Sequence, residues 1–320
     1  MAKILVTGGC GFIGCNFIRR HIASHPDDEI VNLDKLTYAG RRENLADLEG
    51  KGNYSFIKGD ICNPGDAAEA MRGCDAVVNF AAESHVDRSI ADADTFARTN
   101  FLGVKVLCEE ARKQNIKRFL QISTDEVYGQ IANGSSKETD VLRPRNPYSA
   151  AKAAGELLAM SYFTTYGLPV VVTRSSNNYG PWQFPEKVIP LFITNLLMGK
   201  KVPLYGEGKN VRDWLFVMDN CEAIDLVLQK GKAGEIYNIG GEHEMRNIEL
   251  TKAILKELGK GEEMIERVQD RLGHDLRYSL DCAKIKKELG WKPKTPFKKG
   301  LHETVQWYTQ NGQWWKQLVK

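Results

Sequence analysis

Two groups of residues in this 320-residue sequence have the types and spacing needed for chemistry on a hydroxyl group. Tyr148 and Lys152 stand one helical turn apart, so a helix would place both side chains on one face. A neighbouring ammonium group stabilises a phenolate and lowers the pKa of a tyrosine, which can then take a proton from an alcohol. Thr124, Asp125 and Glu126 add a hydroxyl and two adjacent carboxyl groups. Crowding raises the pKa of at least one carboxyl group, so an acid and a base can share one site.

The spacing of the tyrosine and the lysine is weak by itself. It occurs twice more, at 54/58 within a predicted strand and at 205/209 across two glycines in a predicted turn. Only the pair at 148 and 152 begins a predicted helix, directly after Pro147. A surface tyrosine beside a lysine, and a solvated acidic loop at 125–126, remain the alternative interpretations.

A glycine-rich segment suggests a cofactor that would work with the tyrosine. Gly8, Gly11 and Gly14 form Gly-x-x-Gly-x-x-Gly between the first predicted strand and the first predicted helix, where a pyrophosphate can approach the backbone. Asp34 follows 20 residues after Gly14, where its carboxylate would bind ribose hydroxyls and repel a 2′-phosphate. This favours NAD over NADP, and Lys35 weakens the preference without reversing it. The positive nicotinamide ring would also stabilise the Tyr148 phenolate.

Short apolar runs alternate with helix-compatible segments over the first 175 residues. The runs lack a clean alternation of polar and apolar residues, which is typical of strands buried on both faces of a parallel sheet. The predicted strands are 4–6, 30–33, 54–57, 76–80, 119–122 and 170–172, and the longer predicted helices are 12–23, 94–114 and 149–166. We predict an α/β fold with a Rossmann-type doubly wound parallel sheet. Residues 1–175 would form an NAD-binding domain, and residues 176–320 a smaller lobe that mainly binds substrate.

Charge and composition disfavour several other classes of protein. The 44 Lys+Arg and 41 Asp+Glu residues nearly balance, so we expect no nucleic-acid partner. No apolar stretch approaches the roughly 20 residues of a membrane span and no signal-peptide pattern is present, so we expect a cytoplasmic protein with no membrane partner. The seven cysteines show no Cys-x-x-Cys pair and no histidine at metal-ligand spacing, which predicts free thiols and no metal site. Motifs of P-loop NTPases, zinc hydrolases and serine esterases are missing.

Several segments resemble a known family. The segments 7–14, 148–152 and 177–181 are similar to the extended short-chain dehydrogenases/reductases that act on nucleotide sugars. Within that family, the segments 34–40, 81–89, 123–129, 184–187, 211–214 and 270–275 resemble the dTDP-glucose 4,6-dehydratases. The adjacent Asp125 and Glu126 distinguish this group from the related 4-epimerases and decarboxylases. The sequence departs from the usual pattern at Arg41 and Leu272, where the group often has Asn and Pro.

The resemblance implies an NAD-dependent lyase reaction and a homodimer. dTDP-glucose would be oxidised at C4, lose water across C5 and C6, and receive the hydride back at C6, giving dTDP-4-keto-6-deoxyglucose. Tyr148, assisted by Thr124 and Lys152, would take the proton of the 4-hydroxyl. Glu126 would remove the C5 proton, and Asp125 would protonate the departing C6 hydroxyl. A UDP-sugar 4,6-dehydratase, a 4-epimerase and a non-catalytic NAD-binding protein remain alternatives.

Together with the glycine-rich loop and Asp34, the resemblance implies a set of binding residues for each ligand. Cofactor contacts are expected at Gly8, Gly11, Phe12, Ile13, Gly14, Asp34, Lys35, Leu36, Thr37, Asp60, Ile61, Ala81, Ala82, Thr99, Tyr148, Lys152 and Asn178. Contacts with the nucleotide sugar are expected at Ser84, Thr124, Asn177, Lys187, Val188, Tyr205, Arg212, Asn247, Asp270 and His274. Asp60 could equally cap a helix, and Arg212, whose guanidinium suits a diphosphate, could instead pair with Asp213.

Overall fold

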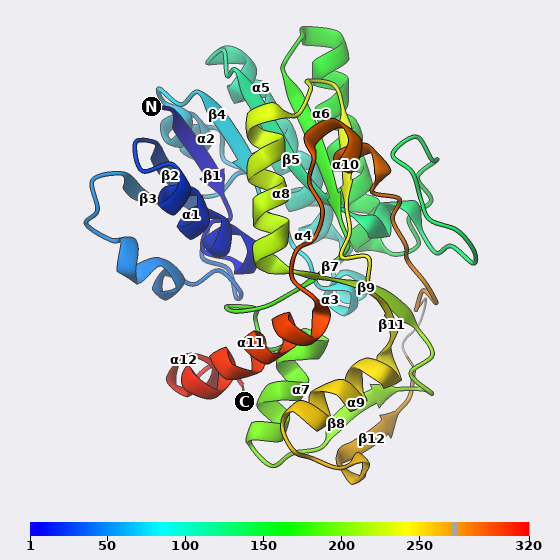
Figure 1. Cartoon of the computed structure of the whole chain (residues 1–320). Coiled ribbons are helices and arrows are strands. Elements are labelled where there is room, and N and C mark those ends of the chain that lie inside the picture. Colours follow the sequence, from blue (N-terminus) through cyan, green and yellow to red (C-terminus); the bar gives the residue numbers. More distant parts are fainter. Residues whose placement is uncertain (271–273, 320) are drawn as a thin grey trace.

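A parallel β-sheet forms the larger part of the molecule. The computed structural model describes residues 1–270 and 274–319. In this described part of the chain, the sheet has seven parallel strands in the order β10-β6-β5-β4-β1-β2-β3 (Figure 1). The strands are β1 (Lys3–Thr7), β2 (Glu29–Asp34), β3 (Tyr54–Lys58), β4 (Ala76–Asn79), β5 (Arg118–Thr124), β6 (Val170–Ser175) and β10 (Ile236–Ile239). The predicted fold class is confirmed.

Both faces of the sheet are covered, which explains why its strands are apolar throughout. Ile4 and Val6 belong to an apolar cluster on one face, and Leu5 between them belongs to the cluster on the other. The first face is covered by α1 (Phe12–Ser24), α8 (Val217–Lys230) and α10 (Ala283–Leu289). The second face is covered by α2 (Pro64–Met71), α5 (Val104–Lys113) and α6 (Pro147–Tyr166).

The segment predicted as one helix at 94–114 is divided in the structure. It consists of α4 (Ala93–Ala97), the π-helical η2 (Arg98–Gly103) and α5. The wider π-helical turn of η2 places the Asn100 carbonyl against Gly155 of α6. A Cβ at position 155 would lie only 2.1 Å from that carbonyl oxygen, so the two helices pack closely. The interruption therefore reflects close helix packing, which periodicity alone does not predict.

The smaller lobe occupies the lower part of Figure 1 and has its own apolar core. In the described residues its strands form a three-stranded sheet, β11-β9-β7, and a two-stranded sheet, β12-β8. Its elements are β7 (Asn177–Tyr179), α7 (Val188–Leu197), β8 (Val202–Tyr205), β9 (Val211–Phe216), β11 (Glu244–Arg246), α9 (Asn247–Glu257), η4 (Glu262–Met264), β12 (Ile265–Val268), α11 (Phe297–Gln310) and α12 (Gly312–Lys316). Between β9 and β11 the chain returns to the larger part as α8 and β10. Residues after 175 therefore belong partly to the larger part and partly to the smaller lobe. The proposed division into two domains stays a prediction.

Three short helices complete the larger part. They are η1 (Arg42–Leu48), α3 (Val86–Ala91) and η3 (Asp125–Tyr128). Within the described residues, no helix has both the length and the apolar character that crossing a bilayer needs. All seven cysteines are free thiols, as predicted.

A buried ion pair links α6 to β6. Glu156 and Arg174 are 1% and 2% exposed, and the Arg174 Nε lies 3.1 Å from the Glu156 Oε1. The Arg174 Nη1 also donates to the Tyr128 hydroxyl at 2.6 Å. Each charge is stabilised mainly by the other, because both have lost their hydration.

Replacing Glu156 by Ala should therefore destabilise the fold strongly. The change leaves the Arg174 charge buried without its partner, which costs about 3–5 kcal/mol of unfolding free energy. Urea denaturation followed by circular dichroism measures this loss. Lys117→Ala, which breaks the exposed 2.7 Å ion pair with Asp75, is the matched control and should cost about 1 kcal/mol or less. Equal losses in the two variants would contradict this account.

Candidate active site

Two adjoining grooves follow the edge of the large sheet at which its parallel strands end. The first groove lies over the glycine-rich loop and the end of β2. The second lies between this edge and the smaller lobe. Ser84, Gln183, Glu186 and Lys187 line both, so the grooves form one continuous cleft. Ligands of parallel α/β sheets bind at this edge.

The glycine-rich loop forms the floor of the first groove. Gly8 has φ +68°, and a Cβ on it would lie 2.6 Å from the Ala81 nitrogen, so only glycine fits there. A Cβ at Gly14 would lie 2.4 Å from the Gly8 carbonyl oxygen. Helix α1 has Gly11 as its N-cap, and this glycine offers no side chain to cap the helix. Residues 11–14 line the groove, and this arrangement fits the diphosphate of a dinucleotide.

Asp34 lies at the end of β2 and is only 7% exposed. Its Oδ2 accepts the Cys10 N–H at 2.9 Å, and its Oδ1 accepts the Leu36 N–H at 2.8 Å. Burial raises the pKa of Asp34, and these two hydrogen bonds oppose the rise. The backbone thus orients the carboxyl group in the wall of the first groove, where ribose hydroxyls were expected.

Lys35 and Asp60 form an ion pair, with 2.9 Å between the Lys35 Nζ and the Asp60 Oδ2. Burial alone would raise the pKa of Asp60, but the Cys62 N–H and Lys35 bring it below its ordinary value. Asp60 does not cap a helix, because the N-cap of α2 is Asn63. The Asp34 carboxylate would repel a 2′-phosphate, and the Lys35 ammonium would attract one. Because Lys35 is paired with Asp60, this attraction should be weak.

The first groove brings together nearly all the residues expected to bind the cofactor. Those that line it are Gly8, Gly11, Phe12, Ile13, Gly14, Asp34, Lys35, Thr37, Asp60, Ile61, Ala81, Ala82, Thr99, Tyr148 and Lys152. Two expected residues do not. Leu36 packs against the apolar core with φ 56°, and Asn178 lines the second groove instead.

The expected acid and base lie in η3, directly after β5 (Arg118–Thr124). The Thr124 Oγ1 accepts the Glu126 N–H at 3.3 Å and donates to the Asp125 Oδ1 at 3.1 Å. Asp125 is 3% exposed, and its Oδ2 has no hydrogen-bond partner among the described residues. Burial, helped by the charge of Glu126, raises the pKa of Asp125 to about 8. Glu126 lines the second groove and accepts a 3.3 Å hydrogen bond from the Asn146 Nδ2.

Helix α6 carries Tyr148 and Lys152 to the end of β5. It begins with a capping box between Asn146 and Ser149, and Pro147 occupies its first turn. The buried Lys152 Nζ donates to the Ile122 carbonyl at 2.6 Å. Burial lowers the pKa of Lys152 to about 8, although the Glu156 charge opposes the change.

The pKa of Tyr148 moves in the opposite direction to that expected from the sequence. Burial and the charge of Glu126 raise it, and a hydrogen bond with the Thr124 side chain opposes the rise. The ring is 9% exposed and packs against Phe96, with the ring centroids 6.3 Å apart. The protein groups alone therefore keep Tyr148 protonated near neutral pH, and the positive charge of an oxidised nicotinamide would be needed to lower its pKa.

The second groove contains most of the residues expected to bind substrate. Ser84, Asn177, Lys187, Val188, Tyr205, Arg212, Asn247 and His274 line it. Thr124 and Asp270, which were also expected, do not line this groove. Thr124 lies at the end of β5, and the Asp270 Oδ1 lies 2.7 Å from the Nδ1 of His274, which does line it. Residues 271–273, which include the unusual Leu272, lie outside the described residues.

Arg212 does not form the alternative ion pair with its neighbour. Its guanidinium donates to the carbonyls of Val211 at 2.7 Å and Asp275 at 2.9 Å. Its Cζ lies 4.4 Å from the centre of the Tyr278 ring. The Asp213 carboxylate instead accepts backbone N–H groups of the 241–243 loop. The Arg212 charge therefore stays available to the second groove.

Sequence reasoning missed the side chains that join the two grooves. The Tyr38 hydroxyl donates to the Glu186 Oε1 at 2.7 Å, and the Arg88 Cζ lies 3.6 Å from the centre of the Tyr38 ring. Arg88 also pairs with the Glu186 Oε2 at 3.4 Å, and the Lys187 Nζ donates to the Ser84 carbonyl at 2.7 Å. These contacts connect the segment 184–187 to the larger part. They fall within or next to motif segments, but no pattern in the sequence pairs them.

Comparisons with known proteins agree with this geometry. A family model described as "GDP-mannose 4,6 dehydratase" matches residues 5–304. The curated dTDP-glucose 4,6-dehydratase of Streptomyces niveus is 52% identical over 99% of this chain and 95% of its own length.

Solved structures are also similar over nearly their whole length. DesIV, a dTDP-glucose 4,6-dehydratase of Streptomyces venezuelae determined with NAD and dTDP bound, superposes with a TM-score of 0.97 at 51% identity, covering 99% of this chain and 100% of that one. The UDP-glucose 4-epimerase of Thermotoga maritima has a TM-score of 0.90 at 31% identity, covering 96% and 99%. The sequence similarity and the paired carboxyl groups agree, and the chain belongs to the family of the dTDP-glucose 4,6-dehydratases.

Proposed function

We propose that this protein is an NAD-dependent lyase that converts dTDP-glucose to dTDP-4-keto-6-deoxyglucose and water. The observation that carries the proposal is the pair of carboxyl groups at the end of β5. Asp125 is buried with its pKa raised to about 8, and Glu126 faces the second groove beside it. Curated relatives that are about half identical over the whole chain are named dTDP-glucose 4,6-dehydratases, which supports the proposal.

The first groove would hold NAD. The diphosphate would lie on residues 11–14, and the adenosine ribose on Asp34. Bound NAD would supply, in its oxidised form, the acceptor for the hydride of C4 of the sugar and, in its reduced form, the donor of that hydride to C6. Because this cycle restores the cofactor in every turnover, the protein needs no second substrate to regenerate it.

Tyr148 would take the proton of the sugar 4-hydroxyl, and Thr124 would orient that hydroxyl by a hydrogen bond. The ammonium of Lys152, fixed on the Ile122 carbonyl, would stabilise the phenolate electrostatically. Burial strengthens this stabilisation, since less water screens the charges.

Asp125 and Glu126 would carry out the elimination. A 4-ketone acidifies the hydrogen at C5, and the Glu126 carboxylate would remove it. Asp125 holds its proton at neutral pH because its pKa is raised, and it would give this proton to the departing C6 hydroxyl. A 4-epimerase needs the ketone but not this acid and base, so their presence favours dehydration over epimerisation.

The nucleotide would lie in the second groove. The Arg212 guanidinium suits a sugar diphosphate because it can donate several hydrogen bonds to phosphate oxygens. Lys187 lies at the junction of the grooves and adds a second positive charge. Thymine and uracil differ by one methyl group, worth about 1 kcal/mol, so the preference for dTDP over UDP rests on the family more than on this groove.

The protein would act as a cytoplasmic homodimer. Leu102, Leu157 and Tyr166 are 50%, 58% and 55% exposed and lie on η2 and α6. The two segments also belong to the part of the chain that the family resemblance associates with a dimer contact. Seven free thiols suit a reducing compartment, which supports a cytoplasmic location.

The reaction can be tested without supplying cofactor. The purified protein, incubated with dTDP-glucose and no added NAD⁺, should release a product lighter by one water, as mass spectrometry and NMR can detect. The double variant Asp125→Asn with Glu126→Gln should still reduce bound NAD⁺, followed by absorbance, but form at least 100-fold less product. Normal product formation by the double variant would remove the elimination role from these residues.

Tyr148→Phe should prevent the first oxidation. The ring still fits the site but has no hydroxyl to accept the proton, so absorbance should show no reduction of bound NAD⁺ and turnover should fall about 10²- to 10⁴-fold. Tyr166→Phe, at an exposed tyrosine of the same helix, is the control and should keep full activity. A Tyr148→Phe variant with wild-type turnover would refute the assignment.

Turnover should decline as the pH rises through about 8. Asp125 has a raised pKa, so it carries its proton below that pH and loses it above, and elimination then lacks its acid. Lys152 loses its charge in the same range. The two effects separate in Asp125→Asn, where the pH dependence of NAD⁺ reduction reports only on the oxidation step. A wild-type rate that rises through this range would contradict the assignment of Asp125.

A further inference from the structure

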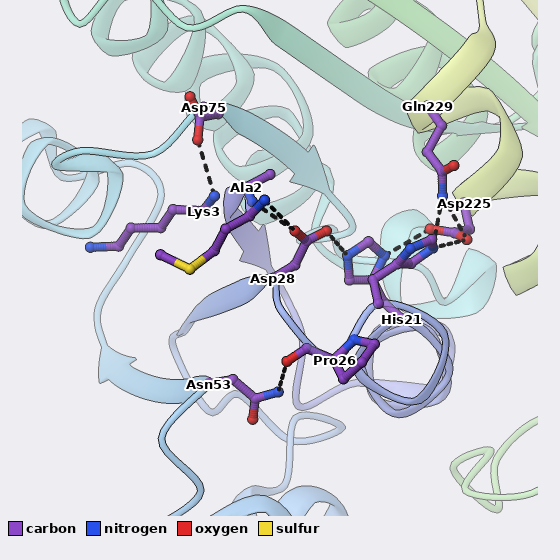
Figure 2. Close-up of polar contacts among 11 residues, drawn as sticks. Ala2, Lys3, His21, Pro26, Asp28, Asn53, Asp75, Asp225 and Gln229 are labelled. Carbon is purple, nitrogen blue, oxygen red and sulfur yellow. Dashed lines mark hydrogen bonds and ion pairs between the residues drawn. The ribbon is translucent and has the colours of Figure 1, made fainter.

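A group of two histidines and two carboxylates lies outside the cleft, where α1 meets α8 (Figure 2). His21 lies in the last turn of α1, and His25 is the C-cap of that helix. The His21 Nδ1 is 2.7 Å from the Asp225 Oδ1, and the His25 Nε2 is 3.0 Å from the Asp225 Oδ2. His21 and Asp225 are 2% and 7% exposed. Two imidazoles from one helix thus face the two oxygens of one buried carboxylate from another.

Asp28 fixes the orientation of the His21 ring. Its Oδ2 lies 3.3 Å from the His21 Nε2, and its Oδ1 accepts the Ala2 N–H at 2.6 Å. When Asp28 accepts the Nε2 proton of a neutral ring, the Nδ1 lone pair points at Asp225. Figure 2 shows His21 held between the two carboxylates. A carboxylate behind the imidazole is the usual arrangement around metal-binding histidines.

The ring nitrogens that face Asp225 can carry either protons or a metal ion. With protons on these nitrogens, the two imidazoles donate to the two Asp225 oxygens; Asp28 lies 4.0 Å from the N-terminal ammonium, and within the described residues no lysine or arginine forms an ion pair with Asp225. With lone pairs on these nitrogens, one divalent cation would take the place of the protons and bind the same nitrogen and oxygen atoms. The experiment distinguishes these cases.

We propose that His21, His25 and Asp225 bind one divalent transition-metal ion, with Zn²⁺ as the best match. Imidazole nitrogen and carboxylate oxygen are preferred zinc ligands. The three donor atoms lie within 4.8 Å of one another, close enough for small side-chain rotations to bring them around one ion.

Gln229 is positioned to complete the coordination. It lies one turn after Asp225 on α8, and its Nε2 is 2.8 Å from the His25 Nε2 and 3.1 Å from the Asp225 Oδ2. A half-turn of the amide places the oxygen at the same point, where it would lie next to the ion as a fourth, weaker ligand.

The ion would hold the fold together and take no part in the reaction. Asp28 directly precedes β2, so the site lies at the edge where the strands begin, opposite the cleft. Helix α1 runs from the glycine-rich loop to this site, and the ion would fix its far end to α8. This proposal departs from the expectation of no metal site. That expectation followed from cysteine spacing and standard motifs, whereas here Asp225 lies about 200 residues from the histidines.

The test uses the full-length enzyme with its bound NAD, without a polyhistidine tag, after dialysis against a chelator. Calorimetric titration with Zn²⁺ should give one ion per chain, and the unfolding temperature should rise. His25→Gln should lose this binding, and Asp28→Asn should weaken it about 10- to 100-fold. His302→Gln is the control, since His302 is also partly exposed and pairs with a carboxylate, that of Glu257. All three variants should keep wild-type turnover.

The wild-type titration alone can overturn the proposal, even if a variant does not fold. No stoichiometric binding, or binding only at millimolar Zn²⁺, means that protons and not a metal fill the cluster. One ion per chain bound equally by wild type and His25→Gln places the zinc elsewhere and overturns it too. Loss in His25→Gln with retention in His302→Gln supports it.

Discussion

The hydrogen bond from the Lys152 Nζ to the Ile122 carbonyl ties the chemistry of this protein to its sheet. It joins the first turns of α6 to the last residues of β5, and so fixes Tyr148 against Thr124, Asp125 and Glu126. The lysine is buried, and burial lowers its pKa to about 8. A charge that is costly to bury is thus kept within one helical turn of Tyr148, where the proposed reaction would form a phenolate.

The smaller lobe places two opposing charges near Asp125. Arg212 of β9 lowers the pKa of Asp125 and Asp213 of the same strand raises it, so the rise comes chiefly from burial and from the charge of Glu126. Asp125 is buried although it lies at the end of a strand, where parallel sheets usually open to solvent. Burial of this strand end is therefore the main cause of the raised pKa.

The parallel sheet, the glycine-rich loop and the Tyr148–Lys152 pair could be predicted because they depend on local patterns, whereas most other residues of the two grooves were expected only from the resemblance to the family. Apolar runs without alternation indicate strands covered on two sides, and the glycine spacing marks a close approach of backbone to ligand. What could not be predicted depends on distant segments. β10 joins the sheet more than 60 residues after β6, the ion pair of Lys35 with Asp60 bridges two strand ends, and burial reverses the expected shift in the pKa of Tyr148. None of these has a signal within one short stretch of sequence.

The contacts of the segment 184–187 with Tyr38, Ser84 and Arg88 lie beside the first groove, where a dinucleotide would bind. Tyr38 and Glu186 come from opposite sides of the cleft, and their hydrogen bond lies beside Phe184, Glu186 and Lys187 of the groove wall. A dinucleotide in the first groove would lie beside these bonds, so we expect its exchange with solution to be slower than diffusion-limited release. Slow exchange suits a catalyst whose redox state returns to its starting point in every cycle, because the same cofactor molecule can serve many turnovers.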